Sequence, residues 1–127
     1  MLKILLVSID KTSMSALKAG FEEHDVQTGW AESGGDALSM IAQRDFNLVV
    51  TDENLGDMTG LEFIKNVVSQ NPMVNCAAVS TLLPEDFHEA SEGLGILMQL
   101  PVRPKPEYAK ELLEHLKSIL DLAIETS

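Results

Sequence analysis

The sequence predicts a doubly wound α/β domain, in which helices cover both faces of a parallel sheet. Extended and helical patterns alternate along all 127 residues, with short loops and no linker, repeat or low-complexity segment. The most strongly patterned segment is residues 46–51, an apolar run dense in β-branched residues that ends at Asp52. Such a continuous run is typical of a strand buried on both faces of a parallel sheet. These observations together indicate one domain, residues 1–127.

Five short segments have the composition of strands. The first and third are apolar, the second is more polar, the fourth is short and apolar, and the fifth is interrupted by Pro101. Because proline cannot donate a backbone hydrogen bond, the fifth strand is expected at an edge of the sheet. The strands are expected at residues 3–7, 26–31, 46–51, 76–79 and 96–102.

Five other segments carry apolar side chains at helical spacing, with residues at their ends that start or stop helices. Thr12 or Ser13 is the expected N-cap of the first helix, since both residue types accept hydrogen bonds from the first free amides. Asn71-Pro72 ends the third helix because a residue before proline avoids the helical conformation. The helices are expected at residues 12–24, 33–42, 61–70 and 84–92, and from Pro106 onward.

Size and charge exclude several classes of function. No apolar run approaches the roughly 20 residues that span a bilayer, and the apolar start of the chain is too short for a secretory signal. The lone Cys76 cannot form an internal disulfide and is expected to be a small buried hydrophobe, which indicates a cytoplasmic location. The net charge of −11 opposes contact with nucleic acid or anionic membranes, which require basic patches.

Right-handed crossovers place the strands in the flavodoxin-like order 2-1-3-4-5. In that order a crevice opens between the carboxyl ends of the first and third strands, and Ser8, Ile9, Asp10 and Asp52 are expected to line it. A carboxylate at the end of a strand, such as Asp52, serves as a nucleophile, a metal ligand or a helix cap. The residue pattern leaves these three roles open.

Four short motifs follow one another along the chain. They are residues 31–38 (AESGGDAL), 48–52 (LVVTD), 58–62 (MTGLE) and the pair Arg103-Pro104. In this order and at this spacing they resemble the receiver domains (response regulators) of two-component signalling, and the likeness covers nearly the whole chain. The resemblance implies a signalling module rather than an enzyme. Such a module accepts a phosphoryl group from a histidine kinase or a phosphotransfer protein and then binds a downstream protein partner.

The resemblance also implies a role for each residue that fits the motifs. Asp52 would be the phosphoacceptor, and Mg²⁺ would offset the repulsion between this carboxylate and the anionic phosphoryl group. A hydroxyl after the fourth strand would bind the transferred group. Ser80 or Thr81 fits that role, depending on the end from which the spacing is counted. Arg103 would supply the positive charge that the family takes from a lysine, and the backbone carbonyl of Asn54 would bind the metal ion.

The chain departs from the family at its acidic pair. Ser8 and Ile9 stand where two carboxylates are expected, and Asp10 is the remaining carboxylate of that loop, one position late. The expected metal ligands are therefore Asp10, Asp52 and Asn54. Because affinity in oxygen-ligand sites follows the ligand charge count, Mg²⁺ is expected to bind weakly or not at all.

Further expectations concern the end of the chain. Arg103 is expected within reach of Asp52, with a cis peptide bond before Pro104. The face formed by the fourth helix, the fifth strand and the fifth helix is the usual contact surface of the family. A homodimer through it is expected to be constitutive, because positions 99 and 100 lack the aromatic switch residue. The candidate contact residues are Phe87, Leu97, Gln99 and Tyr108.

Three functions stay open at this point. The first is a phosphoaccepting receiver domain that acts through Asp52. The second is a pseudo-receiver that signals by binding alone, since Ser8 and Ile9 impair the metal site. The third is a nucleotide or flavin binder, which is disfavoured because the loop at residues 8–13 lacks glycine and the aromatic content is 5%.

Overall fold

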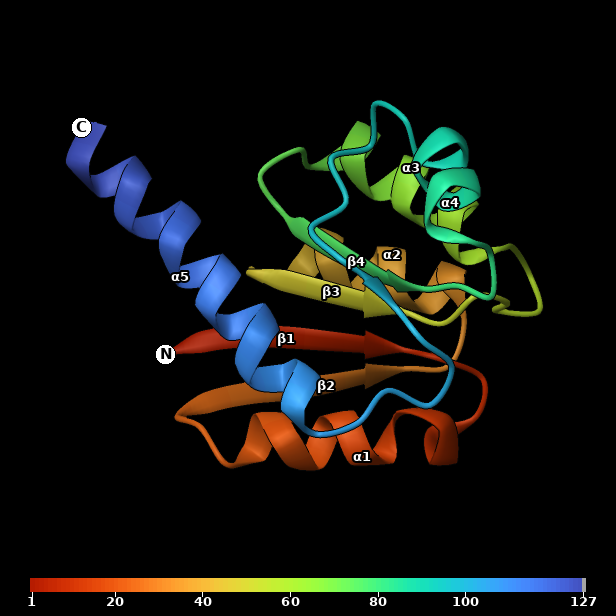
Figure 1. Ribbon diagram of the computed structural model, residues 1–127, viewed down its shortest axis with the longest axis horizontal. Helices are drawn as coiled ribbons and strands as arrows, with labels where there is room; N and C mark the ends of the chain where they lie inside the picture. Colours follow the sequence, from red (N-terminus) through yellow and green to blue (C-terminus); the bar gives the residue numbers. More distant parts are fainter. Residues whose placement is uncertain (127) are drawn as a thin grey trace.

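The computed structural model describes residues 1–126, with side chains described up to Leu120. It contains a five-stranded parallel sheet in the order β2-β1-β3-β4-β5, with a helix after each strand (Figure 1). The predicted fold class and strand order are therefore confirmed. The strands are β1 (Leu2–Val7), β2 (Val26–Ala31), β3 (Leu48–Thr51), β4 (Asn75–Val79) and β5 (Gln99–Leu100). The helices are α1 (Lys11–Glu22), α2 (Gly34–Gln43), α3 (Gly60–Gln70), α4 (Pro84–Ala90) and α5 (Glu107–Thr126).

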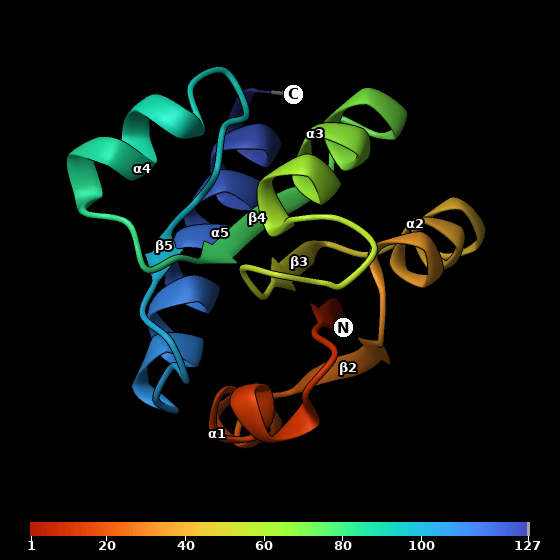
Figure 2. The same ribbon diagram turned by 90° about the vertical axis from the view of Figure 1, so that its right-hand side faces the viewer.

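The helices form two layers around the sheet. Helices α1 and α5 cover one face, and α2, α3 and α4 cover the other (Figure 2). Side chains alternate between the two layers along each strand, so that Leu6 of β1 packs with α1 and α5 while Leu5 packs with the opposite layer. All four residues of β3 are buried, which explains the continuous apolar run in its sequence.

Cys76 of β4 lies in this core and is 2% exposed, as predicted. Burial raises the pKa of its thiol to about 12, because the thiolate cannot be solvated there. Among the described residues, no helix is both long enough and apolar enough to cross a membrane.

Two elements, α1 and β5, have ends that differ from the sequence prediction. Helix α1 begins one residue earlier than expected, and its N-cap is Asp10, whose carboxylate accepts a hydrogen bond of 2.9 Å from the amide of Thr12. The predicted cap at Thr12 or Ser13 is therefore wrong, because the aspartate before them competes successfully for the same amides. Strand β5 is shorter than predicted, and Pro101 ends it at the sheet edge where a missing donor costs nothing.

The parallel strands bring their carboxyl ends to one side of the molecule, on the right in Figure 1 and facing the viewer in Figure 2. The loops that follow β1, β3, β4 and β5 meet there. Every site residue that the sequence singles out belongs to these loops or to a strand end beside them.

Candidate functional site

Asp52 follows β3 directly and is held next to the end of β1 by the sheet itself. Its amide donates a hydrogen bond of 2.9 Å to the carbonyl of Val7, which continues the pairing of β1 with β3 by one step. Ser8 continues the pairing of β1 with β2 in the same way, through a bond of 3.1 Å from its amide to the carbonyl of Ala31. The side chains of Ser8 and Asp52 therefore meet at the expected crevice.

The Asp52 carboxylate is hydrogen-bonded through both of its oxygens. Oδ2 accepts from the hydroxyl of Ser8 at 2.8 Å and from the hydroxyl of Ser13 at 2.9 Å, and Oδ1 accepts from the amide of Glu53 at 2.9 Å. Ser13 reaches the site because the Asp10 cap fixes the first turn of α1. Ser13 was expected only as a possible cap of the first helix, and its contact with Asp52 is a role that sequence reasoning missed.

The hydroxyls of Ser8 and Ser13 face the same two acceptor oxygens. Both lie between 2.8 and 3.0 Å from Asp52 Oδ2 and from the backbone carbonyl of Asp10. Each hydroxyl has a single proton, and because the Asp10 carbonyl already accepts from the amide of Ser13 at 3.1 Å, both protons can be directed to Asp52 Oδ2. Ser8 is completely buried, whereas Asp52 is partly exposed. The arrangement surrounds the carboxylate with neutral donors on its β1 side.

Glu53 forms a second polar cluster with the turn that follows β4. Its Oε2 accepts from the Thr81 amide at 2.8 Å and from the Ser80 hydroxyl at 3.2 Å, and its Oε1 accepts from the Thr81 hydroxyl at 3.0 Å. Both candidate switch hydroxyls are therefore engaged by one carboxylate. Sequence reasoning missed Glu53, although an acidic residue directly after the predicted acceptor is a signal that could have drawn attention to it.

Arg103 lies apart from these clusters. Its side chain is exposed, and the ion pair found among the described residues is Lys18 with Glu22 at 3.4 Å, so Arg103 does not pair with Asp52. The peptide bonds of the described residues are all trans, and Arg103 itself has a positive φ of 53°. Both geometric expectations are therefore wrong: the bond before Pro104 is trans, and the Arg103 side chain is exposed to solvent on a left-handed turn of the backbone.

Comparison with known proteins decides the family. The model of the response regulator receiver domain matches residues 4–117. The chain belongs to this family. Among solved structures, this receiver domain is similar to the chemotaxis response regulator CheY4 of Vibrio cholerae, with a TM-score of 0.80 and 22% identity over 91% of this chain and 98% of that one. A CheY-like receiver domain protein from Methanospirillum hungatei gives a TM-score of 0.80 at 24% identity, covering 100% of this chain and 99% of that one. These likenesses show the fold alone.

Curated relatives of the receiver domain are much longer proteins. The autoinducer 2 sensor kinase/phosphatase LuxQ of Vibrio harveyi is 26% identical over 106 residues, which are 80% of this chain but 12% of that protein. A protein-glutamate methylesterase/protein-glutamine glutaminase of Syntrophus aciditrophicus is 26% identical over 98% of this chain and 38% of its own length. The activities in these names are those of the whole relatives.

The receiver domain offers a poor donor set for a divalent cation. Among the described residues no group of three or more His, Cys, Asp or Glu side chains converges on a possible metal position. The carboxylate of Asp10 caps α1. The side-chain oxygen of Asn54 accepts from the amide of Gly56 at 3.0 Å, so Asn54 could offer only its backbone carbonyl, the neutral ligand that the resemblance implies. Of the predicted metal ligands, Asp52 is then the one whose carboxylate lies in the crevice. Mg²⁺ prefers six oxygen ligands including anionic ones, so these residues do not fit a tight magnesium site.

The loop between β3 and α3 is anchored by a residue that sequence reasoning also missed. The Asp57 carboxylate accepts from the amides of Gly35 and Gly34 at 2.9 and 3.0 Å, at the start of α2. These bonds lower the pKa of Asp57 below its ordinary value of 3.8. At the other end of the loop, Gly60 lets α3 approach so closely that a side chain there would overlap the carbonyl of Asp52. The backbone around Asp52 is therefore fixed from both sides.

Proposed function

We propose that this receiver domain signals by binding other proteins, without Mg²⁺-dependent phosphorylation of Asp52. The observation that supports the proposal is the pair of hydrogen bonds from Ser8 and Ser13 to Asp52 Oδ2. These two hydroxyls lie on the side of Asp52 where the family has a pair of acidic side chains. They satisfy the carboxylate without a cation, and they add no negative charge that would attract one. Signalling by this domain would then depend on the binding of other proteins to its surface.

A second candidate is the phosphoaccepting receiver domain. Asp52 is partly exposed at the carboxyl end of the central strand β3, and this exposure favours attack by one of its oxygens on a phosphohistidine. The phosphorus–nitrogen bond would break as the bond to Asp52 forms, with a histidine kinase or phosphotransfer protein as donor. Ser80, Thr81 and Arg103 remain the candidates for contacts to the transferred group, with Asp10 and Asn54 as the proposed ligands of weakly bound Mg²⁺. The proposed location of these reactions is the cytoplasm.

Intact-mass measurement separates the two candidates. The full chain is incubated with acetyl phosphate and Mg²⁺, and an Asp52→Ala variant is treated in parallel as the control. The proposed function predicts no added phosphoryl group in either protein. A gain of one phosphoryl group in the wild type that is absent from the variant would establish the second candidate instead.

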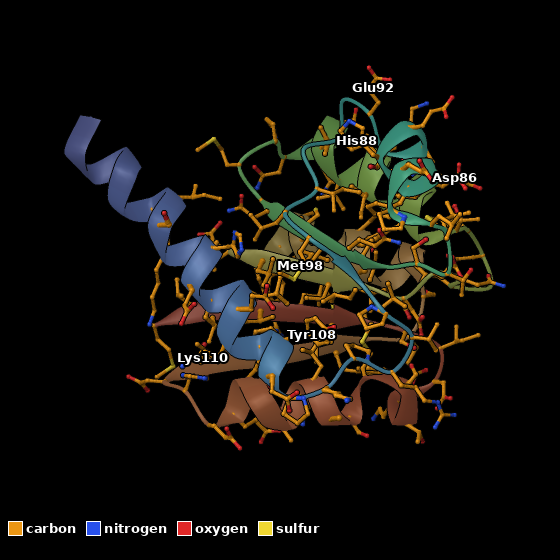
Figure 3. All side chains as sticks on the ribbon, viewed as in Figure 1. Asp86, His88, Glu92, Met98, Tyr108 and Lys110 are labelled. Carbon is orange, nitrogen blue, oxygen red and sulfur yellow. The ribbon has the colours of Figure 1, made fainter. Side chains whose placement is uncertain are left out.

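The proposed contact surface is the face made by α4, β5 and α5. Figure 3 shows Asp86 and His88 on α4, Glu92 in the turn after it, and Tyr108 and Lys110 on α5. Helix α4 is acidic, and the described part of α5 exposes three glutamates beside Lys110 and Lys117, so the face as a whole is negative. A homodimer through it would depend on pairing these two lysines with the acidic α4 of a second copy related by a two-fold axis. The same acidic residues suit a downstream partner with basic side chains.

Phe87 does not belong to this surface. It is 6% exposed and packs into the core beneath α4, so its expected role as a contact residue is wrong. Leu97, Gln99 and Tyr108 are partly exposed and remain candidates. Sedimentation with and without beryllofluoride and Mg²⁺ tests the homodimer. The same mass is expected in both conditions, and conversion from monomer to dimer upon addition would show a working phosphorylation switch.

A further inference from the structure

The turn after β4 gathers hydrogen-bond donors around a single carboxylate. The Ser80 hydroxyl, the Thr81 amide and the Thr81 hydroxyl all lie within 3.2 Å of the Glu53 carboxylate. The amide of Leu82 donates to Ser80 Oγ at 3.1 Å, so this hydroxyl accepts one bond and its own proton is available for Glu53. A chain of donors that polarise one another in this way is stronger than its separate bonds.

Successive donors on one turn form a concavity that prefers an anion. Here the anion comes from the chain itself, and the connection through β3 keeps it permanently at high local concentration. A free oxyanion would have to displace the Glu53 carboxylate and would also approach the negative Asp52. We infer that Glu53 is an internal ligand of the Ser80–Thr81 turn and occupies the position that the resemblance assigns to the transferred phosphoryl group. The inference rests on the proposed function for its meaning in signalling, since an internal ligand removes the need for a transferred one.

The internal ligand has a structural consequence for the loop between β4 and α4. Glu53 holds the start of this loop to the β3 side, and the side-chain amide of Gln99 donates to the carbonyl of Leu82 at 2.8 Å from the β5 side. The loop is thus tied at both sides. It presents Leu82 and Leu83, which are 42% and 62% exposed, at the entrance to α4. The contacts from Glu53 and Gln99 hold these two leucines in place without phosphorylation.

Phosphate binding to the full chain in the absence of metal tests the inference. Wild type, Glu53→Ala and a control variant, Glu89→Ala, are titrated with inorganic phosphate in EDTA, and the amide resonances of Thr81 and Leu82 are followed by NMR. Glu89 is an exposed residue of α4, and its removal changes the net charge equally. Saturable shifts at these two amides are expected in Glu53→Ala and in neither of the other proteins.

Hydrogen exchange gives a second, independent measurement. In the absence of phosphate the Thr81 amide should exchange about tenfold faster, or more, in Glu53→Ala than in wild type, because a charge-assisted hydrogen bond is lost. Added phosphate should slow this exchange again in the variant. The Thr81 amide should also exchange faster in Glu53→Gln, which keeps the side-chain volume. This variant replaces Glu53→Ala in the experiment if the alanine variant does not fold.

Two outcomes would overturn the inference. One is equal protection of the Thr81 amide in wild type and both Glu53 variants, and the other is a wild-type response to phosphate as large as that of Glu53→Ala. Neither result depends on phosphorylation of Asp52, since no phosphodonor or metal is present. A phosphoryl group gained in the mass experiment would instead overturn the proposed function and leave the phosphate titration unaffected.

Discussion

Restoring a carboxylate at position 8 should convert a stable metal-free site into a metal-dependent one. Ser8 is completely buried, and its hydroxyl donates to Asp52 Oδ2 at 2.8 Å. Ser8→Asp replaces this donor by a second negative charge close to the first. The variant therefore loses a favourable hydrogen bond and gains a like-charge contact, and both changes oppose folding when no cation is present.

The geometry sets the size of the effect. Two unit charges about 4 Å apart repel by ~4 kcal/mol at an effective dielectric constant of ~20. Because Asp52 is partly exposed, solvent screening reduces this value by about half. The lost charge-assisted hydrogen bond contributes a comparable ~1.5 kcal/mol. We expect Ser8→Asp to lower the free energy of unfolding by about 3.5 kcal/mol in EDTA.

Magnesium should reverse part of this loss. At about ten times its dissociation constant, a bound ion adds ~1.4 kcal/mol to the free energy of unfolding. Adding Ile9→Asp to Ser8→Asp supplies another carboxylate from the same exposed loop and should tighten the binding of Mg²⁺ further. Wild type should gain almost nothing from the same concentration of Mg²⁺.

Urea unfolding followed by circular dichroism, in EDTA and in Mg²⁺, measures these differences. Ser8→Asn is the matched control for shape, because it is similar in size to aspartate but uncharged. Ser15→Asp places the same charge on an exposed position of α1. If Ser8→Asp were as stable as wild type in EDTA, or if Mg²⁺ stabilised wild type equally, the reasoning about Asp52 would be refuted.

Three other predictions concern the scaffold. The pKa of Asp57 is lowered in the folded protein, so its contribution to stability is present above pH 3.8 and is lost as the pH falls below that value; urea midpoints of wild type and Asp57→Asn should therefore converge in acid, and a constant difference would contradict this. The Cys76 thiol, with a pKa of about 12, should react with iodoacetamide at mildly alkaline pH only after unfolding, and rapid labelling of native protein seen by mass would count against its burial. Gly20→Ala should cost about 1–3 kcal/mol in urea unfolding, because its Cβ would overlap the backbone of Pro106 beneath α5, and an unchanged midpoint would show that the two helices separate easily.

The sequence by itself determined the architecture of this protein. The apolar run that ends at Asp52, the alternation of extended and helical segments and the position of Pro101 were sufficient for the sheet order, the edge strand and the location of the crevice. Burial of Cys76 also followed from its neighbours. These features depend on the hydrophobic effect and on backbone hydrogen bonding, whose periodic patterns are visible in the order of the residues.

Only the tertiary structure decided how the polar residues at the crevice are paired. Ser13 reaches Asp52 because Asp10 rather than Thr12 caps α1, and Glu53 reaches Thr81 because the turns after β3 and β4 lie side by side. Arg103, which the sequence placed at the site, faces solvent instead. A hydrogen bond between loops requires donor and acceptor within about 3 Å and depends on each backbone torsion between them, so residue type and spacing do not specify it.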